Sequence, residues 1–171
     1  MKTKLFLYFI FLSAFVLINF FGAKAQTWRS PVFLETQTSG TGGVTGIYNS
    51  LLTVNGNPAM TSYDQTHGNL MFVRANDAAG STWGSPIPID VEGDVGQFTS
   101  LQIVNGMPAV SYYDATNGDL KYVRANDVSG TNWGTPVSID ITGNVGYYIS
   151  LQIVNGVPAI AYYDQTNGDL K

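Results

Sequence analysis

The chain has 171 residues, of which 44% are hydrophobic and 12% are charged, and its formal net charge is −4. The acidic balance excludes a nucleic-acid partner, because binding to phosphates needs a cationic surface, and it suits neutral ligands or cations. The sequence contains no cysteine, which excludes disulfides, thiolate metal ligands and a cysteine nucleophile.

Residues 1–25 have the pattern of a secretory signal peptide. Two lysines precede an apolar stretch at 5–21, and Ala23-Lys24-Ala25 supplies a small-residue cleavage site just before the first polar residues. A transmembrane anchor would share the apolar stretch, but the cleavage site favours removal of the segment. We therefore expect a secreted or cell-surface protein that begins at residue 26 and has no membrane span after cleavage.

Residues 28–50 match the last part of a unit that recurs further along the chain. The tetrapeptide Trp-Arg-Ser-Pro at 28–31 corresponds to Trp-Gly-Ser-Pro at 83–86. By this match, residues 31–35 are predicted to form a lone outer strand. The residues up to 50 then connect it to the first complete unit.

A repeat of 50 residues organises the rest of the chain. Residues 51–100 align without a gap with residues 101–150, and residues 151–171 begin a third copy that is truncated. The two full copies share the runs L-x-x-V-N-G-x-P-A, Y-D-x-T-x-G-x-L and V-R-A-N-D-x-x-G-x-x-W-G-x-P. Residues 26–171 are therefore predicted to form one repeat domain.

Each unit is predicted to contain four short strands, because apolar residues alternate and turn residues recur at short intervals. In order within the unit, these strands are at about 148–154, 158–163, 120–125 and 136–141. Asn155-Gly156 separates the first two strands, and this dipeptide favours the type I′ hairpin turn. Four antiparallel strands of this length are typical of a β-propeller blade. The alternative is a solenoid of stacked β-coils, whose repeats are usually shorter and lack a hairpin Asn-Gly.

The blade count indicates an incomplete propeller. One orphan strand, two full units and part of a third amount to about three blades, whereas propellers have about four to eight. Lys171 ends the sequence at a point where its counterpart Lys121 continues into Tyr122 and Val123. We expect a fragment that is completed by further C-terminal blades or that self-associates, because an open propeller exposes blade faces and strand edges.

The turn between the third and fourth strands resembles the Asp-box of sialidase-like propellers. It reads Asp77-x-x-Gly80-x-x-Trp83, and the next copy has the same three residue types at the equivalent positions. The usual box has one residue between Asp and Gly where this chain has two. In such a turn the Asp is expected to accept hydrogen bonds from local amides, while the Trp fills the space between blades.

The whole unit resembles the repeats of secreted bacterial β-propeller proteins. The resemblance rests on the run S-L-Q-I-V-N-G-x-P-A-x-x-Y-Y-D-x-T-N-G-D-L-K and covers about residues 28–171. It implies a propeller fold, export from the cell and contact with glycans.

The second–third and fourth–first connections emerge at the same end of a four-stranded blade, and we expect ligand binding there. The candidate residues in these connections are Asp64, Asn69, Phe98, Asp114, Asn117, Asp119, Tyr147, Tyr148, Asp164 and Asp169. Carboxylates and amides beside aromatic rings suit sugars, whose hydroxyls need planar hydrogen-bond partners and whose C–H faces pack on π-surfaces. The alternative is structural, because Asp and Asn are good turn formers that bond their own backbone.

No cofactor is predicted, except that the second–third turns are candidates for binding calcium. The pattern Asp-x-x-Asn-Gly-Asp places three oxygen-bearing side chains around a turn, but it lacks the EF-hand spacing and a closing Glu. No catalytic residues are predicted, because repeated polar groups do not build the asymmetric arrangement that catalysis needs.

We expect an extracellular binding or adhesion module that recognises a glycan or another surface polymer through loops at one end of a propeller. Two alternatives stay open. One is a fragment of a sialidase-like glycoside hydrolase, whose nucleophile and acid would lie on other blades. The other is a structural repeat without a ligand.

Overall fold

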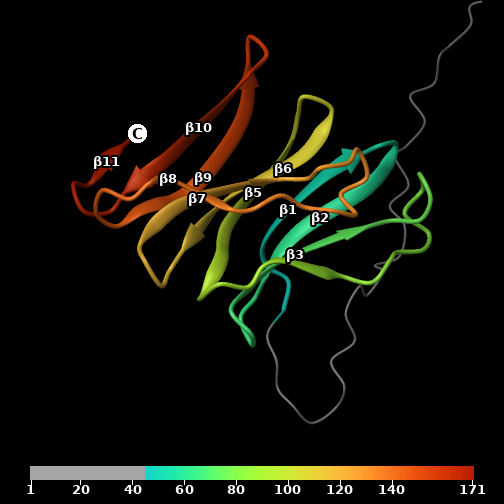
Figure 1. Ribbon diagram of the computed structural model, residues 1–171, viewed down its shortest axis with the longest axis horizontal. Helices are drawn as coiled ribbons and strands as arrows, with labels where there is room; N and C mark the ends of the chain where they lie inside the picture. Colours follow the sequence, from blue (N-terminus) through green and yellow to red (C-terminus); the bar gives the residue numbers. More distant parts are fainter. Residues whose placement is uncertain (1–44) are drawn as a thin grey trace, which may run out of the picture. The chain divides into compact units, whose positions relative to one another are not determined.

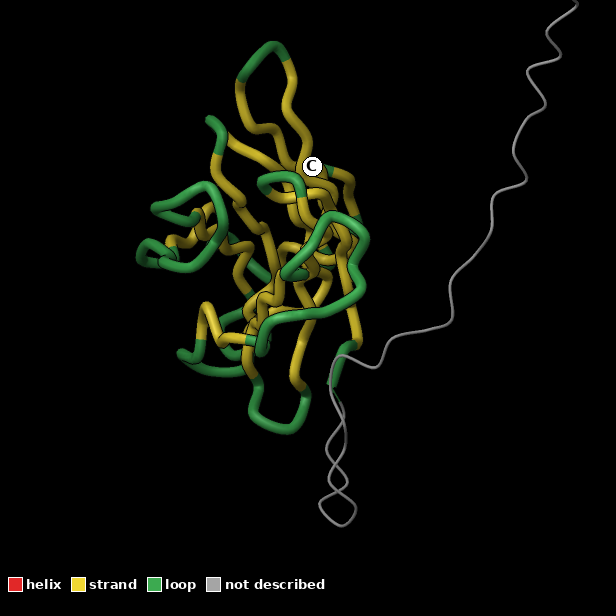
Figure 2. The backbone as a smooth tube through the Cα atoms, turned by 90° about the vertical axis from the view of Figure 1, so that its right-hand side faces the viewer, coloured by secondary structure: helices red, strands yellow, loops and turns green. Residues whose placement is uncertain are grey.

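The computed structural model describes residues 45–171, and this part of the chain consists of strands and turns without a helix (Figure 2). The strands are β1 (Ile47–Val54), β2 (Asn57–Asp64), β3 (Asn69–Arg74), β4 (Ile87–Asp90), β5 (Val95–Val104), β6 (Met107–Asp114), β7 (Asp119–Arg124), β8 (Val137–Asp140), β9 (Val145–Val154), β10 (Val157–Asp164) and β11 (Asp169–Leu170). The all-β prediction is confirmed. The signal peptide predicted at 1–25 and the lone strand predicted at 31–35 lie outside the described residues. Across 45–171, no helix has the length and apolar character needed to cross a membrane.

The strands form three antiparallel sheets that follow the repeat (Figure 1). Sheet 1 contains β1 to β4, sheet 2 contains β5 to β8, and sheet 3 contains β9 to β11. In each sheet, strands that are consecutive in sequence are neighbours in space. The first strands contact one another in succession, β1 with β5 and β5 with β9, and β5 and β9 also contact the second and third strands of the preceding sheet. The predicted unit of four antiparallel strands is therefore confirmed for sheets 1 and 2.

The hairpin between the first and second strands of each sheet is an Asn-Gly turn, as predicted. In sheet 1, Asn55 and Gly56 have φ values of 44° and 79°, and Val54 pairs with Asn57 across the turn. Two consecutive positive φ values belong to the type I′ turn, whose twist matches that of the strands it joins. These hairpins mark one end of every sheet, and the second–third turns mark the other.

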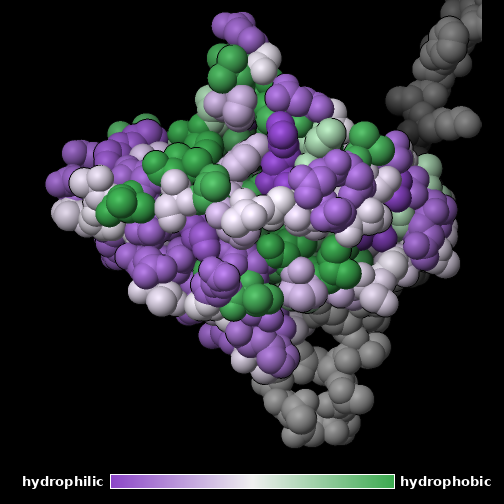
Figure 3. Space-filling view, viewed as in Figure 1, coloured by the Kyte–Doolittle hydropathy of each residue, from purple (hydrophilic) through white to green (hydrophobic). Residues whose placement is uncertain are grey.

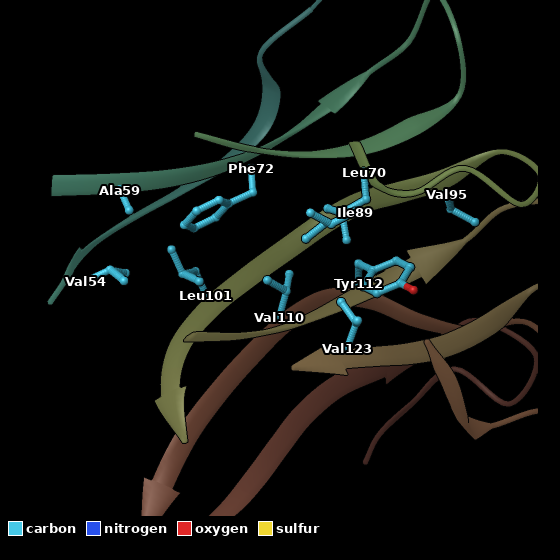
Figure 4. Packing of buried hydrophobic residues seen from close by; sticks show 10 residues of the cluster. All are labelled: Val54, Ala59, Leu70, Phe72, Ile89, Val95, Leu101, Val110, Tyr112 and Val123. Carbon is cyan, nitrogen blue, oxygen red and sulfur yellow. The ribbon is translucent and has the colours of Figure 1, made fainter. Parts of the chain in front are cut away.

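The main core lies between sheet 1 and sheet 2 (Figure 4). Its buried residues are Val54, Ala59, Leu70, Phe72 and Ile89 from sheet 1 and Val95, Leu101, Val110, Tyr112 and Val123 from sheet 2. Each fully buried large apolar side chain contributes about 1.5–3 kcal/mol. Packing of one sheet on the next is therefore a principal stabilising contribution.

The Asp-box turns are held together by the carboxylate at their first position. In the first turn, Asp77 Oδ1 accepts hydrogen bonds from the backbone N–H groups of Ala79 and Ser81, both at 3.0 Å. Asp77 Oδ2 accepts from the backbone N–H of Thr82 at 3.0 Å. Asp127 makes equivalent bonds in the second turn. The expected role of the Asp is confirmed.

The tryptophan of the second Asp-box turn packs between sheets, as expected. The Trp133 indole N–H donates to the Gly130 carbonyl oxygen at 2.9 Å, which fixes the ring over its own turn. The ring then meets Phe72 of sheet 1 edge-on, with 5.1 Å between ring centroids. The turn of one sheet therefore reaches the neighbouring sheet through its tryptophan.

Acid is expected to weaken the first Asp-box turn. Hydrogen bonds from the Ser81 and Thr82 backbone lower the pKa of Asp77 from 3.8 to about 2. A carboxyl with a depressed folded-state pKa stabilises the fold above its unfolded-state pKa, and this contribution is lost as the pH falls through the folded-state value. The free energy of unfolding should therefore fall between about pH 4 and pH 2. In urea titrations, Asp77→Asn should show a smaller fall over this range, and an equal fall in both proteins would contradict the assigned role.

A buried polar cluster joins β4, the outer strand of sheet 1, to the second and third strands of sheet 2. Asp90 of β4 accepts hydrogen bonds from Lys121 Nζ at 2.7 Å and from the Tyr112 hydroxyl at 2.5 Å, and all three residues are buried. Burial, followed by the hydrogen bond to Asp90, raises the pKa of Tyr112, so its hydroxyl stays protonated and continues to donate. The interface between sheets 2 and 3 repeats this cluster with Asp140, Tyr162 and Lys171.

Candidate functional site

The first strands of sheets 2 and 3 begin earlier than predicted. Because β5 begins at Val95 and β9 at Val145, the residues Phe98, Tyr147 and Tyr148 lie inside strands. The prediction that they belong to the fourth–first connections is wrong. The pairing register with the second strand shifts around these residues, which marks a β-bulge in each first strand. A bulge breaks the alternation of side chains on which the predicted strand boundary depended.

Each bulge holds an aromatic residue in the left-handed region of backbone conformation. The φ value is 51° at Tyr48, 53° at Phe98 and 52° at Tyr148, which occupy the same position in the three repeats. For a bulky residue this conformation is a rare outlier and costs about 1–3 kcal/mol. Because the strain recurs in all three sheets, it is a property of the repeat and not a local irregularity.

The aromatic rings near these bulges form a continuous row across the three sheets. Ring centroids are 4.5 Å apart for Tyr48 and Phe98 and 5.0 Å apart for Phe98 and Tyr148. Tyr113 and Tyr147 lie beside this row, with 4.5 Å between their ring centroids. We call the whole set the aromatic ladder, and its members are Tyr48, Tyr63, Phe98, Tyr113, Tyr147, Tyr148 and Tyr163.

The ladder is accessible on its outer side and anchored on its inner side. The Tyr148 side chain is 73% exposed and that of Tyr48 is 41% exposed. Tyr63 and Tyr113, which belong to the second strands, are buried. The buried rings hold the row in place, so the exposed rings present a preformed apolar surface.

Residues that precede the first strands fix the hydroxyl groups of the buried rings. The Tyr63 hydroxyl donates to Asp94 Oδ1 at 2.5 Å, and the Tyr113 hydroxyl donates to Asn144 Oδ1 at 2.6 Å. Burial, followed by the hydrogen bond to Asp94, raises the pKa of Tyr63 to about 12. Burial, followed by the hydrogen bond with Tyr147, raises the pKa of Tyr113. Both phenols are therefore protonated at neutral pH.

Asp94 and Asn144 are themselves held by the next sheet. Their backbone N–H groups donate to Thr116 Oγ1 at 2.7 Å and to Thr166 Oγ1 at 2.6 Å. The Asn144 amide also donates through Nδ2 to Gln165 Oε1 at 2.5 Å. A carboxylate and amides beside exposed rings are the planar hydrogen-bonding groups that sugar hydroxyls need.

The predicted acidic residues of the second–third turns hold their own turns together. Asp114 accepts from the backbone N–H groups of Thr116 at 3.0 Å and Asn117 at 3.1 Å, and from Asn117 Nδ2 at 2.9 Å. Asp64 and Asp164 cap the equivalent turns in sheets 1 and 3. The structural alternative accounts for these contacts, and ligand binding by the three carboxylates stays a prediction.

The remaining predicted residues, Asn69, Asp119 and Asp169, begin the third strands. Asp119 Oδ2 accepts from Ser138 Oγ at 3.2 Å, and Asp169 is exposed. None of the three takes part in the ring contacts of the ladder. Among the residues of 45–171, no group of three or more His, Cys, Asp or Glu side chains gathers as a metal site would require. Calcium binding at these turns stays a prediction.

Sequence reasoning found three members of the ladder and missed the others. The missed residues are Tyr48, Tyr63, Tyr113 and Tyr163, with their polar partners Asp94 and Asn144. The sequence does contain a pattern that could have identified them. An aromatic residue stands two positions after the glycine at 46, 96 and 146. Tyrosine also recurs at 63, 113 and 163.

A separate cleft of about 630 Å³ opens between sheets 2 and 3. Tyr122 and Ile139 from sheet 2 and Tyr162 from sheet 3 belong to its lining, which includes no residue of the aromatic ladder. Phe72, the counterpart of Tyr122 in sheet 1, packs against Trp133 of sheet 2. The residues that line this cleft therefore correspond to residues through which sheet 1 packs on sheet 2.

No family model and no curated protein sequence matches the chain. Among solved structures, it is similar to a mutant of the NanB sialidase from Streptococcus pneumoniae and to a second structure described as NanB plus Optactamide. Both similarities have 16% sequence identity and a TM-score of 0.45, and both cover 71% of this chain. The chain spans 22% of the length of those sialidase chains.

Proposed function

We propose that the chain is a secreted glycan-binding module, built as part of a β-propeller, that recognises sugar rings through the aromatic ladder. The observation that carries this proposal is the repeated, strained aromatic residue at Tyr48, Phe98 and Tyr148. Such strain costs stability and concentrates at ligand-binding sites. The ring of Tyr148 is largely exposed, so folding gains little from it in return. Packing of a ligand on this ring would explain why the strained aromatic residue is kept.

The chemistry around the ladder supports a carbohydrate ligand. The exposed rings of Tyr48 and Tyr148 flank the half-buried ring of Phe98 at 4.5 and 5.0 Å, and together they form an extended surface on which the C–H faces of successive sugar rings can pack. Asp94, Asn144 and Gln165 supply carboxylate and amide groups at the same place. Because the rings recur in three sheets, a polymer with several sugar units fits the surface better than a single sugar.

The pKa values of the buried tyrosines favour binding over catalysis. A tyrosine nucleophile reacts as its phenolate, which a lowered pKa or an adjacent general base can supply, and a lowered pKa is the route that Tyr63 and Tyr113 lack. The pKa values of Tyr63 and Tyr113 are instead raised, by burial and by their hydrogen bonds. These hydroxyls are suited to donating hydrogen bonds, and the hydrolase alternative gains no support from them.

The contacts between sheets support the propeller arrangement. Each repeat closes its own sheet, whereas a solenoid would pair strands of successive repeats within common sheets. Successive sheets meet through their first strands, which are the strands that surround the axis of a propeller. The aromatic ladder then lies beside the axis, at the end opposite the Asn-Gly hairpins.

The Tyr148→Gly variant separates ligand binding from folding. Glycine removes the ring and adopts a φ of 52° without strain, so the free energy of unfolding should stay unchanged or rise by about 1 kcal/mol. Affinity for the glycan should fall at least about tenfold, which corresponds to about 1.4 kcal/mol. A glycan array probed with the intact secreted chain identifies the ligand, and calorimetric titration then gives the affinity of both proteins.

Val128→Gly is the matched control for this experiment. Val128 is also an exposed apolar residue, but it lies in the second Asp-box turn, beside the Asn-Gly hairpin of sheet 1. Its replacement should leave the glycan affinity unchanged. Tight binding to a protein, with no glycan bound on a broad array, would overturn the carbohydrate ligand. An unchanged affinity in Tyr148→Gly would overturn the site.

A further inference from the structure

One carboxylate beside the aromatic ladder has no cationic partner. Asp94 is half-buried, and its Oδ1 accepts the hydrogen bond from the Tyr63 hydroxyl. Among residues 45–171, no group donates to Asp94 Oδ2 and no basic side chain forms an ion pair with Asp94. The carboxylates of Asp90 and Asp140, by contrast, are paired with lysines. Because removal of an unpaired charge from water is unfavourable, Asp94 is a group that a cation would stabilise.

The fold does not need the charge of Asp94. Asn144 holds the same repeat position, and its Oδ1 accepts the Tyr113 hydroxyl at 2.6 Å, as Asp94 Oδ1 accepts the Tyr63 hydroxyl at 2.5 Å. The backbone N–H groups of both residues also donate to equivalent threonines of the next sheet. An amide therefore anchors a buried tyrosine of the ladder in the same way as a carboxylate does. The negative charge itself is left without a structural role.

The chain satisfies Asn144 more completely than Asp94. The Asn144 amide donates to Gln165 Oε1 at 2.5 Å and to the Tyr147 hydroxyl at 3.3 Å. Ala115 holds the repeat position of Gln165 beside Asp94, and it has no polar side-chain group. Asp94 Oδ2 is therefore left for a group that comes from outside the chain.

The surroundings of Asp94 are acidic. Mostly hydrophilic side chains cover the edge where the second–third turns lie (Figure 3, lower left). The acidic residues at this end of sheets 1 and 2 are Asp64, Glu92, Asp94, Asp114 and Asp119. Arg74 and Arg124 end the third strands on the side of the Asn-Gly hairpins, and Lys121 forms ion pairs with two carboxylates. This excess of negative charge attracts cations and disfavours anionic sugars.

We propose that the ladder binds a glycan with free amino groups, and that Asp94 pairs with a protonated amine of the bound sugar. The inference rests on the proposed function and adds the chemical class of the ligand. The Tyr48 ring lies 6.2 Å from the Tyr63 ring, whose hydroxyl is bonded to Asp94. A protonated amine at this place is attracted by the faces of the rings and by the carboxylate together. A polymer of glucosamine offers one such amine on every sugar unit.

A glucosamine oligosaccharide and its N-acetylated form test the charge, because the two differ in the amine alone. Calorimetric titration of the intact chain, at a mildly acidic pH that keeps the amines protonated, should show at least about tenfold tighter binding of the amino form. In Asp94→Asn the two forms should bind about equally. The circular dichroism should stay unchanged, since asparagine already serves at position 144. A preference that persists in Asp94→Asn would overturn the pairing.

Glu92→Gln is the matched control. It removes the same charge from an exposed side chain in the same connection between β4 and β5, and the preference should stay within about twofold because solvent and salt screen exposed charges. An equal loss in both variants would assign the preference to overall charge and contradict the pairing with Asp94.

The inference and the proposed function fail in different ways. Binding of neutral or acidic glycans alone, lost in Tyr148→Gly, would overturn the inference and leave the proposed function standing. The absence of any bound glycan on a broad array would overturn both.

Discussion

Replacement of Asp90 by alanine is expected to lower the free energy of unfolding by about 3 kcal/mol. Asp90 accepts hydrogen bonds from both Lys121 and Tyr112 at the interface of sheets 1 and 2. Its removal leaves the buried ammonium of Lys121 with Asp114, whose carboxylate oxygen is 3.8 Å away. Urea unfolding of the two proteins, followed by circular dichroism, measures the difference.

Lys121→Met provides the matched control, because Met71 occupies the same position in the first repeat. In the double variant Asp90→Ala/Lys121→Met no buried ammonium is left without Asp90, so part of the lost stability should return. The difference between the double variant and the sum of the singles gives the coupling energy of the pair. Additive losses would show that the ion pair does not stabilise this interface.

Replacement of Gly96 by alanine is expected to lower the free energy of unfolding by about 3 kcal/mol or more, through strain and a steric clash. Gly96 has a φ of 109°, and a Cβ atom there would lie 2.8 Å from Leu70 Cα in sheet 1. Because Leu70 contributes backbone at this contact, rotation of a side chain cannot relieve the clash. The first strand of sheet 2 would have to move away from sheet 1.

Gly46 is the matched control for this prediction. It holds the same repeat position with a φ of 78°, and a Cβ atom there would meet nothing within 4 Å. Gly46→Ala should therefore cost only the backbone strain, about 1 kcal/mol. The excess loss in Gly96→Ala, measured by urea unfolding, isolates the close approach of the two sheets. Equal losses in the two variants would contradict that approach as the reason for the glycine.

The sequence predicted those parts of the fold that depend on local chemistry. Asn55-Gly56 and its two repeats identified the hairpins, because few other dipeptides accept two successive positive φ values. Asp77 and Trp83 identified the Asp-box turn, whose hydrogen bonds all lie within a few residues. The repeat itself then defined the four-stranded sheet.

Apart from the tryptophan of the Asp-box turn, the contacts between sheets could not be predicted. Phe98 and Tyr148 interrupt the alternation of their strands, so the alternation does not reveal that β5 and β9 begin three residues before them. The ladder joins rings about one repeat apart in sequence, and nothing in a single unit indicates that Tyr48 meets Phe98. For Asp114 the sequence left two readings open, and the buried carboxylate with its turn hydrogen bonds fits the structural one.

The most direct test of the central claim is the location of a bound glycan on the folded chain. Nuclear Overhauser contacts can be recorded between sugar C–H protons and the aromatic side chains, using the tightest ligand from the array. We predict contacts with the rings of Phe98 and Tyr148 and their loss in Tyr148→Gly. Contacts confined to the cleft between sheets 2 and 3, or to the Asn-Gly hairpins, would contradict the account.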